Sequence, residues 1–71
     1  MTDTSVHIKV GKRIQEIRTS KGISQQILAA KCNFEKGNMS RIESGRVNIT
    51  LSTMNRISTA LEVELIELFK F

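Results

Sequence analysis

The chain has 71 residues, of which 39% are hydrophobic, and it carries a formal net charge of +4 and one cysteine. This length fits one small domain, which buries only about 60% of its unfolded surface and so has a thin margin of stability. One cysteine excludes a disulfide within the chain, and the sequence contains no run of about 18 apolar residues that could span a membrane. The first eight residues lack the pattern of a signal peptide, so we expect a cytoplasmic protein.

Basic residues are concentrated in one part of the chain. Residues 9–46 carry nine Lys or Arg and three Glu, a net charge of +6, whereas residues 47–71 carry a net charge of −1. This concentration favours a polyanion as the partner of that part of the surface. An ordinary solvated surface of Lys and Arg is the alternative interpretation.

Helical periodicity runs through nearly the whole chain, and strand alternation never persists beyond a few residues. We predict an all-α, compact bundle of five helices over about residues 8–21, 25–32, 36–44, 51–61 and 64–69. The apolar positions of the first and fourth helices are Val10, Ile14, Ile17, Leu51, Met54, Ile57 and Leu61. Residues 1–7 are expected to be a flexible N-terminus, and residues 8–71 a single domain without a linker or repeat.

The second and third predicted helices form the most informative segment, from Ser24 to Gly45. Ser24 is a good N-cap, Asn33 tolerates the left-handed conformation that a tight turn needs, and Gly45 is a good C-cap. Two helices this short cannot bury both of their faces on each other, so the third must offer its polar face to a partner. A helix of this size fits the major groove of DNA.

Other kinds of site find little support in the sequence. Cys32 lies on the apolar face of the second helix, where it is expected to be a small buried hydrophobe rather than a redox or metal-binding residue. His7 has no second His or Cys at ligand spacing, so we expect no metal. The chain shows no second domain in which a ligand could be sensed, so no cofactor or small-molecule ligand is expected either. The chain also lacks a His or Cys cluster, a phosphate loop and a plausible carboxylate pair, so it is not expected to be an enzyme.

Four segments resemble the phage Cro/repressor-type helix-turn-helix proteins, the XRE-like regulators: VGKRIQEIR (10–18), KGISQ (21–25), MSRIESG (39–45) and LEVELIELF (61–69). They occur in the family's order and spacing and cover about residues 8–69. The resemblance implies a lambda-repressor-like DNA-binding domain with the helix-turn-helix at its second and third helices. The third helix would lie in the major groove, and the second would cross the backbone.

The resemblance also implies roles for individual residues. The base-facing positions hold Lys36, Gly37, Ser40 and Arg41, the phosphate-contacting positions hold Gln25, Asn38, Arg46 and Asn48, and an internal salt bridge joins Arg18 to Glu43. From its own chemistry, Arg41 fits the O6 and N7 of guanine, with a phosphate clamp or an ion pair to a neighbouring Glu as alternatives. Lys36 fits a phosphate better than a base, and Gln25 could instead cap its own helix.

The sequence departs from the family pattern at several positions. Glu35 replaces the Ser or Thr that usually caps the recognition helix, Ile27 is apolar at a usually polar site, and Glu62 replaces the Gly that ends the fourth helix. Gly37 removes a side chain from a base-facing position and costs about 1 kcal/mol of helix stability relative to Ala. The groove contact at Gly37 is therefore either close and made by the backbone, or absent.

The last residues are too apolar for a free tail. One helix can turn only about half of them into its own core, and an exposed apolar patch often marks an interface. We expect a two-fold homodimer with an interface formed by Asn55, Thr59, Leu65, Ile66, Phe69 and Phe71. Two recognition helices would then lie about 34 Å apart and read a palindrome. The alternative is that these residues complete the core of a monomer.

The leading function is sequence-specific binding of double-stranded DNA by a transcriptional regulator, most simply a repressor associated with the nucleoid. A related alternative is the antitoxin of a toxin–antitoxin pair, which represses its own operon and binds a toxin protein. Controllers of restriction–modification systems are a third variant of the same mechanism. A small helical adaptor that binds protein and no nucleic acid is the alternative from another class, and DNA binding that weakens steeply with salt would exclude it.

Overall fold

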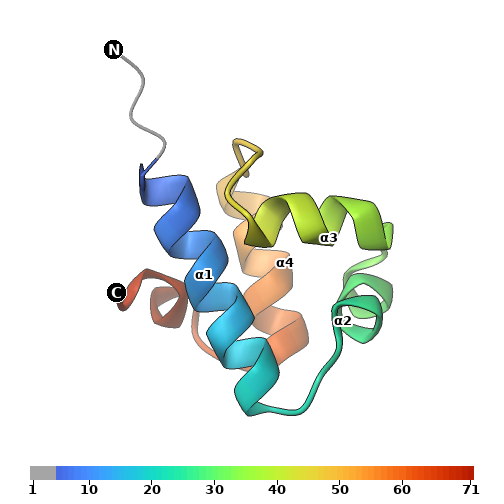
Figure 1. The fold of residues 1–71 in the computed structure, drawn as a ribbon. Helices are drawn as coiled ribbons and strands as arrows, with labels where there is room; N and C mark the ends of the chain where they lie inside the picture. The colour runs from blue at the N-terminus through green and yellow to red at the C-terminus, as the bar shows by residue number, and fades with distance from the viewer. Residues whose placement is uncertain (1–4) are drawn as a thin grey trace.

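The computed structural model describes residues 5–71, and every regular element in this range is helical (Figure 1). In chain order the elements are α1 (Ser5–Ser20), α2 (Gln25–Cys32), α3 (Lys36–Glu43), α4 (Leu51–Leu61) and the 3-10 helix η1 (Leu65–Phe69). The all-α prediction is confirmed. Across residues 5–71, no helix combines the length and the hydropathy that crossing a membrane requires.

The first helix is longer than its apolar periodicity indicated. α1 begins at Ser5, three residues before the predicted start at Ile8, so residues 5–7 of the expected flexible N-terminus are helical. Residues 1–4 of that segment lie outside the described residues. Val6 and Ile8 are exposed, so the first turn of α1 has no buried apolar stripe from which a helix could have been predicted.

The predicted start and end of α2 are confirmed by the backbone and side-chain contacts at its two ends. The Ile27 N–H donates to the Ser24 hydroxyl at 3.1 Å, and Asn33 ends α2 in the left-handed conformation with φ 60°. Glu35, which replaces the Ser or Thr that usually caps the recognition helix, makes no capping hydrogen bond to the described residues. Glu62 ends α4 at φ 59°, a left-handed conformation that costs a non-glycine residue on the order of 1 kcal/mol.

The fifth element differs from the predicted α-helix. η1 spans five residues with 3-10 geometry, because a segment this short is fixed by a few long-range anchors rather than by its own α-helical turns. Leu68 is fully buried, and the Arg13 side chain of α1 donates from Nε to the Glu67 carbonyl oxygen at 2.8 Å. These contacts hold η1 against α1 and α4.

The apolar core collects residues from all five elements. Its buried members are Val10, Ile14, Ile17, Leu28, Ala29, Cys32, Met39, Ile42, Met54, Ile57, Leu61 and Leu68. The predicted burial of Cys32 is confirmed. The placement of Leu51 in the apolar stripe of α4 is wrong: its side chain is 67% exposed, because it occupies the first position of α4, beyond the reach of the core.

A close crossing of α1 and α3 fixes the orientation of α3. A Cβ atom on Gly11 would lie 2.5 Å from the Ile42 carbonyl oxygen and 2.6 Å from that of Glu43, far inside normal contact distance. Only glycine allows the two helices to approach this closely. The C-terminal end of α3 is therefore held against α1, and its other side faces outward.

Candidate nucleic-acid interface

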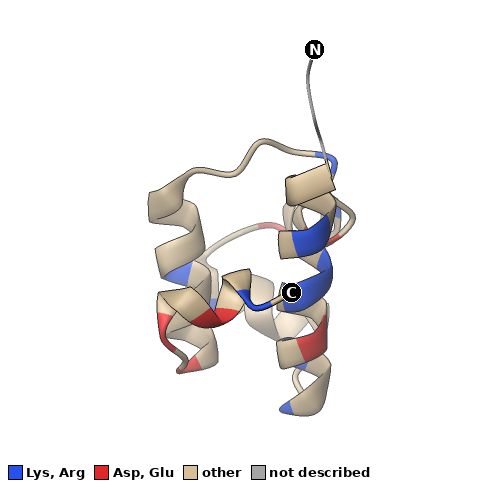
Figure 2. Ribbon diagram, turned by 90° about the vertical axis from the view of Figure 1, so that its left-hand side faces the viewer, with Lys and Arg blue, Asp and Glu red and all other residues tan. Residues whose placement is uncertain are grey.

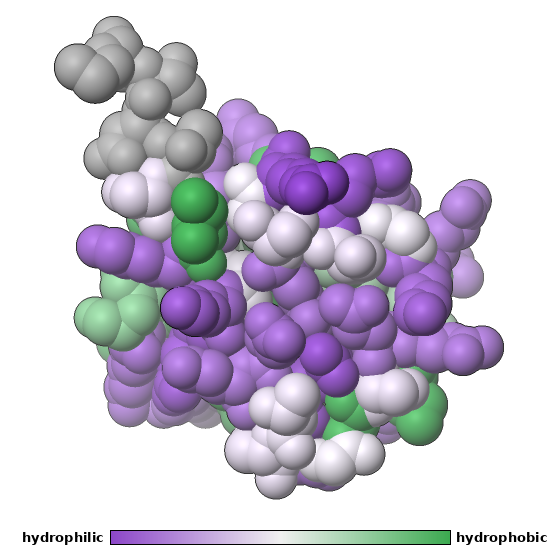
Figure 3. Space-filling view, viewed as in Figure 1, coloured by the Kyte–Doolittle hydropathy of each residue, from purple (hydrophilic) through white to green (hydrophobic). Residues whose placement is uncertain are grey.

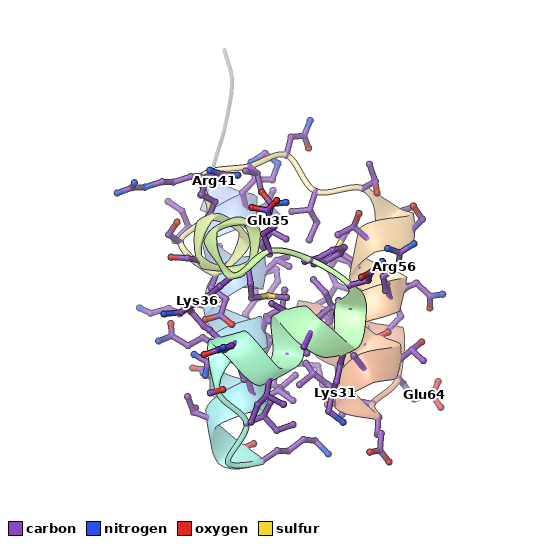
Figure 4. All side chains as sticks on the ribbon, turned by 90° about the vertical axis from the view of Figure 1, so that its right-hand side faces the viewer. Lys31, Glu35, Lys36, Arg41, Arg56 and Glu64 are labelled. Carbon is purple, nitrogen blue, oxygen red and sulfur yellow. The ribbon has the colours of Figure 1, made fainter. Side chains whose placement is uncertain are left out.

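The outer face of α3 is polar and exposed along its length. Met39, Ile42 and Glu43 are buried, whereas the predicted base-facing residues Lys36, Gly37, Ser40 and Arg41 are all exposed, as is Asn38. Lys36 and Arg41 lie on the outer side of α3, away from the bundle (Figure 4). The helix therefore presents two cations and a set of neutral polar groups to solvent, with no acidic residue between positions 36 and 42.

The acidic residues of the C-terminal part lie apart from this face. Glu62 and Glu64 lie in the connection between α4 and η1 and Glu67 lies in η1, and Figure 2 shows acidic colour over this segment as well as on α1. Figure 3 shows hydrophilic residues over much of the face formed by α1 and α3. One acid does border α3, because the exposed Glu35 immediately precedes it. Glu67 pairs with Arg13 of α1, so the basic and acidic parts of the sequence meet there, whereas the two cations on the outer face of α3 form no such pair among the described residues.

A buried ion pair fixes the end of α3. Arg18 donates from Nε to Glu43 Oε2 at 2.7 Å and from its second terminal nitrogen to Oε1 at 3.0 Å. Its remaining terminal nitrogen donates to the Ile23 carbonyl oxygen at 2.8 Å. Both side chains of the pair are buried, so the predicted Arg18–Glu43 salt bridge is present and joins α1 to α3.

Gln25 takes part in the same network. Its Nε2 donates to Glu43 Oε1 at 3.0 Å, which ties the first turn of α2 to the end of α3. The sequence assigned Gln25 either to a phosphate or to the cap of its own helix. Ser24 caps α2 instead, and the half-buried Gln25 amide is turned toward α3 in the free protein.

Arg41 also has a partner on its own helix. Its terminal nitrogen donates to Asn38 Oδ1, one helical turn earlier. Among residues 5–71 it forms no ion pair with a Glu, which was one of the alternatives for this residue. No carboxylate among the described residues therefore neutralises the guanidinium at the exposed face.

The loop after α3 brings further polar groups to the same side. Arg46 and Asn48 are exposed in this loop, as their predicted role requires. Between α3, the loop and the start of α4 lies an open hollow of about 250 Å3, here called the α3–α4 hollow. Its polar lining consists of Asn38, Asn48, Thr50 and Thr53, and Phe34 and Ile42 are among its apolar residues. Thr50 and Thr53 were missed as site residues because their proximity to Asn38 arises only from the folding of the loop.

The residues predicted for a dimer interface are mostly exposed. Asn55, Thr59, Ile66, Phe69 and Phe71 are exposed, and Leu65 is half-buried against the core. Leu51, which the sequence analysis assigned to the core, lies four and eight residues before Asn55 and Thr59 and so shares their helix face. The Phe71 ring has the Lys9 ammonium 5.7 Å from its centre.

Comparison with known proteins identifies the family. The sequence profile of the Cro/C1-type HTH DNA-binding domain matches residues 13–71. The control protein C.BamHI of Bacillus amyloliquefaciens is 34% identical over 68 residues, which cover 94% of this chain and 84% of that protein. The immunity repressor of Bacillus phage phi105 is 36% identical over 55 residues, which cover 78% of this chain and 38% of that repressor.

Solved structures agree with this assignment. The restriction–modification controller protein C.AhdI from Aeromonas hydrophila is similar with a TM-score of 0.85 and 37% identity, over 87% of this chain and 94% of that one. The controller C.Esp1396I is similar with a TM-score of 0.83 and 34% identity, over 92% of this chain and 84% of that one. The chain thus belongs to the Cro/C1-type helix-turn-helix family and is a sequence-specific DNA-binding transcription regulator, not an enzyme.

Proposed function

We propose that this protein is a homodimeric transcriptional controller of a restriction–modification system, which binds a palindromic operator with α3 in the major groove. The observation that carries the proposal is the exposed, cationic outer face of α3, held by the buried Arg18–Glu43 pair. Two solved structures named as restriction–modification controllers, which match 87% and 92% of this chain, support this variant over an antitoxin. Such a protein acts in the cytoplasm, on the DNA of the nucleoid.

Each part of the interface has a separate role in this proposal. Arg41 reads a guanine, since its fork of N–H donors matches O6 and N7. Lys36 and Arg46 neutralise phosphates on either side, and Asn48 in the loop adds a neutral backbone contact. Gln25 reaches a phosphate beside the first turn of α2 while its amide keeps α2 and α3 in register.

The dimer surface is proposed from the exposed apolar residues of α4 and η1. Leu51 and Ile66 are 67% and 63% exposed, and Phe69 and Phe71 extend the same C-terminal region. Exposed apolar side chains in this number on so small a domain favour a partner surface. A second copy of the chain is the occupant that also supplies the two half-sites of a palindrome.

Sedimentation tests the dimer. An Ile66→Asp variant is expected to be monomeric at micromolar concentration, because the carboxylate would be buried between the two copies. Ile27→Asp is the matched control, since Ile27 is 49% exposed on α2, outside the proposed surface, and should leave the dimer intact. A wild-type protein that sediments as a monomer would remove the palindrome from the proposal.

Binding to the DNA upstream of its own gene and of the adjacent gene tests the function. Affinity should fall steeply with salt, because each neutralised phosphate releases counterions. Arg41→Ala should change the preferred site, whereas Lys36→Ala should weaken all sequences alike. Binding without salt dependence or site preference would favour the protein adaptor, and an adjacent toxin gene would favour the antitoxin.

A further inference from the structure

Asn38 and Arg41 are joined side chain to side chain on the outer face of α3. The terminal nitrogen of Arg41 donates to Asn38 Oδ1, and residues three apart on a helix lie side by side. We propose that Asn38 is a positioning residue: it orients the Arg41 guanidinium for base recognition, so that base preference depends on the pair. The inference rests on the proposed placement of α3 in the major groove.

The bond leaves Arg41 able to read a base. A guanidinium carries five N–H donors, of which Asn38 takes one, and a guanine edge offers two acceptors. Both residues are exposed, and Arg41 has no ion pair within residues 5–71 that would have to break first. The bond to Asn38 and a bidentate contact to guanine can therefore coexist.

Asn38 contributes by restricting a long and mobile side chain. Ordering such a side chain at an interface normally reduces affinity by about 2- to 12-fold, and part of that loss is avoided when the free protein already holds it. The gain is specific, because only the base pair that uses the guanidinium benefits. A neutral amide also leaves the positive charge of Arg41 uncompensated near the DNA, which a carboxylate at position 38 would not.

A direct phosphate contact is the competing role for Asn38. The side chain lines the α3–α4 hollow together with Asn48, Thr50 and Thr53, on the side where the loop is proposed to follow the DNA backbone. Loss of a phosphate contact weakens all sequences equally, whereas loss of positioning weakens only the base pair that Arg41 reads. Asn48 supplies a matched control, because it is exposed, lines the same hollow and has no bond to Arg41.

The experiment measures dissociation constants for the selected operator and for operators with each base pair of a half-site replaced. At one base pair, Arg41→Ala should reduce the ratio of the dissociation constants for the replaced and the selected operator by about 5- to 150-fold. Asn38→Ala should reduce discrimination at that base pair by about 2- to 12-fold and leave the others unchanged. In the Arg41→Ala background, the Asn38→Ala change should have no further effect on discrimination.

Two further variants separate positioning from other roles. Asn38→Asp keeps an acceptor for Arg41, so it should preserve the base preference while lowering affinity for every sequence through repulsion of phosphates. Asn48→Ala should lower affinity without changing preference. Helical circular dichroism and thermal unfolding of each variant confirm that the fold is retained.

The outcomes distinguish this proposal from the function on which it rests. A wild-type protein that binds no DNA at low salt refutes both. If the wild type selects a site and Asn38→Ala weakens all sequences by one factor, or acts equally with and without Arg41, the positioning role is wrong and the function stands. If Arg41→Ala leaves the base preference unchanged, the role of the Asn38–Arg41 pair in base recognition is likewise wrong, and the proposed function still stands.

Discussion

Replacing Gly37 by Ala is expected to stabilise the protein, because glycine at this position has no structural purpose. A Cβ atom added at Gly37 meets nothing within 4 Å, and Gly37 is not among the residues with positive φ. Its cost is therefore the helix propensity alone, about 0.5 to 1 kcal/mol relative to Ala. For a domain of this size, that gain corresponds to a rise in melting temperature of about 2 to 8 °C.

Thermal unfolding followed by circular dichroism at 222 nm measures this effect, and Gly11→Ala provides the contrast. The methyl group at Gly11 would meet two carbonyl oxygens of α3 within 2.6 Å, so that variant should lose about 1 to 3 kcal/mol or more. A melting temperature that falls in Gly37→Ala would refute the reasoning. If the groove contact at Gly37 is close, the same variant should also bind the operator more weakly despite its greater stability.

Three other predictions concern the interactions that support the site and the core. Glu43→Ala should lower the free energy of unfolding by about 3 to 5 kcal/mol in urea titrations, since it leaves Arg18 buried without its charge partner; a loss below about 1 kcal/mol would contradict this. The hydrogen bond from Lys70 is the main cause that lowers the pKa of Glu67 below 4.5. The ionised Glu67 carboxylate therefore stabilises the fold above pH 4.5, and this stabilisation is lost as the pH falls through the lowered pKa. The difference in melting temperature between the wild type and Glu67→Gln should therefore shrink as the pH falls below 4.5. A difference that stays constant with pH would contradict the stabilising role of the ionised Glu67. Burial raises the pKa of the Cys32 thiol against the opposing charge of Arg56, so a thiol reagent should react far more slowly with the folded chain than in urea, and equal rates would count against burial.

Local chemistry made the helices and turns around α3 predictable. Ser24 caps α2 as expected, because a hydroxyl at an N-cap needs only the amides two or three residues ahead, and Thr50 caps α4 for the same local reason. Asn33 adopts the left-handed turn for a similarly local reason. The outward side of residues 36–41 also followed from the sequence, since the buried stripe of Met39 and Ile42 fixes which face a short helix can expose.

Long-range packing decided the features that the sequence left open or misplaced. Leu51 continues the apolar spacing of α4, yet its position at the helix end puts it in solvent, and η1 is a 3-10 helix held by Arg13 and Leu68. Partners distant in sequence also determined the bond of Gln25 to Glu43. Helix periodicity and caps depend on neighbours within about four residues, so the sequence by itself determined the elements and the exposed face of α3. Which turns reach the core, and which polar groups meet across elements, depend on how the helices pack, and only the tertiary structure decided them.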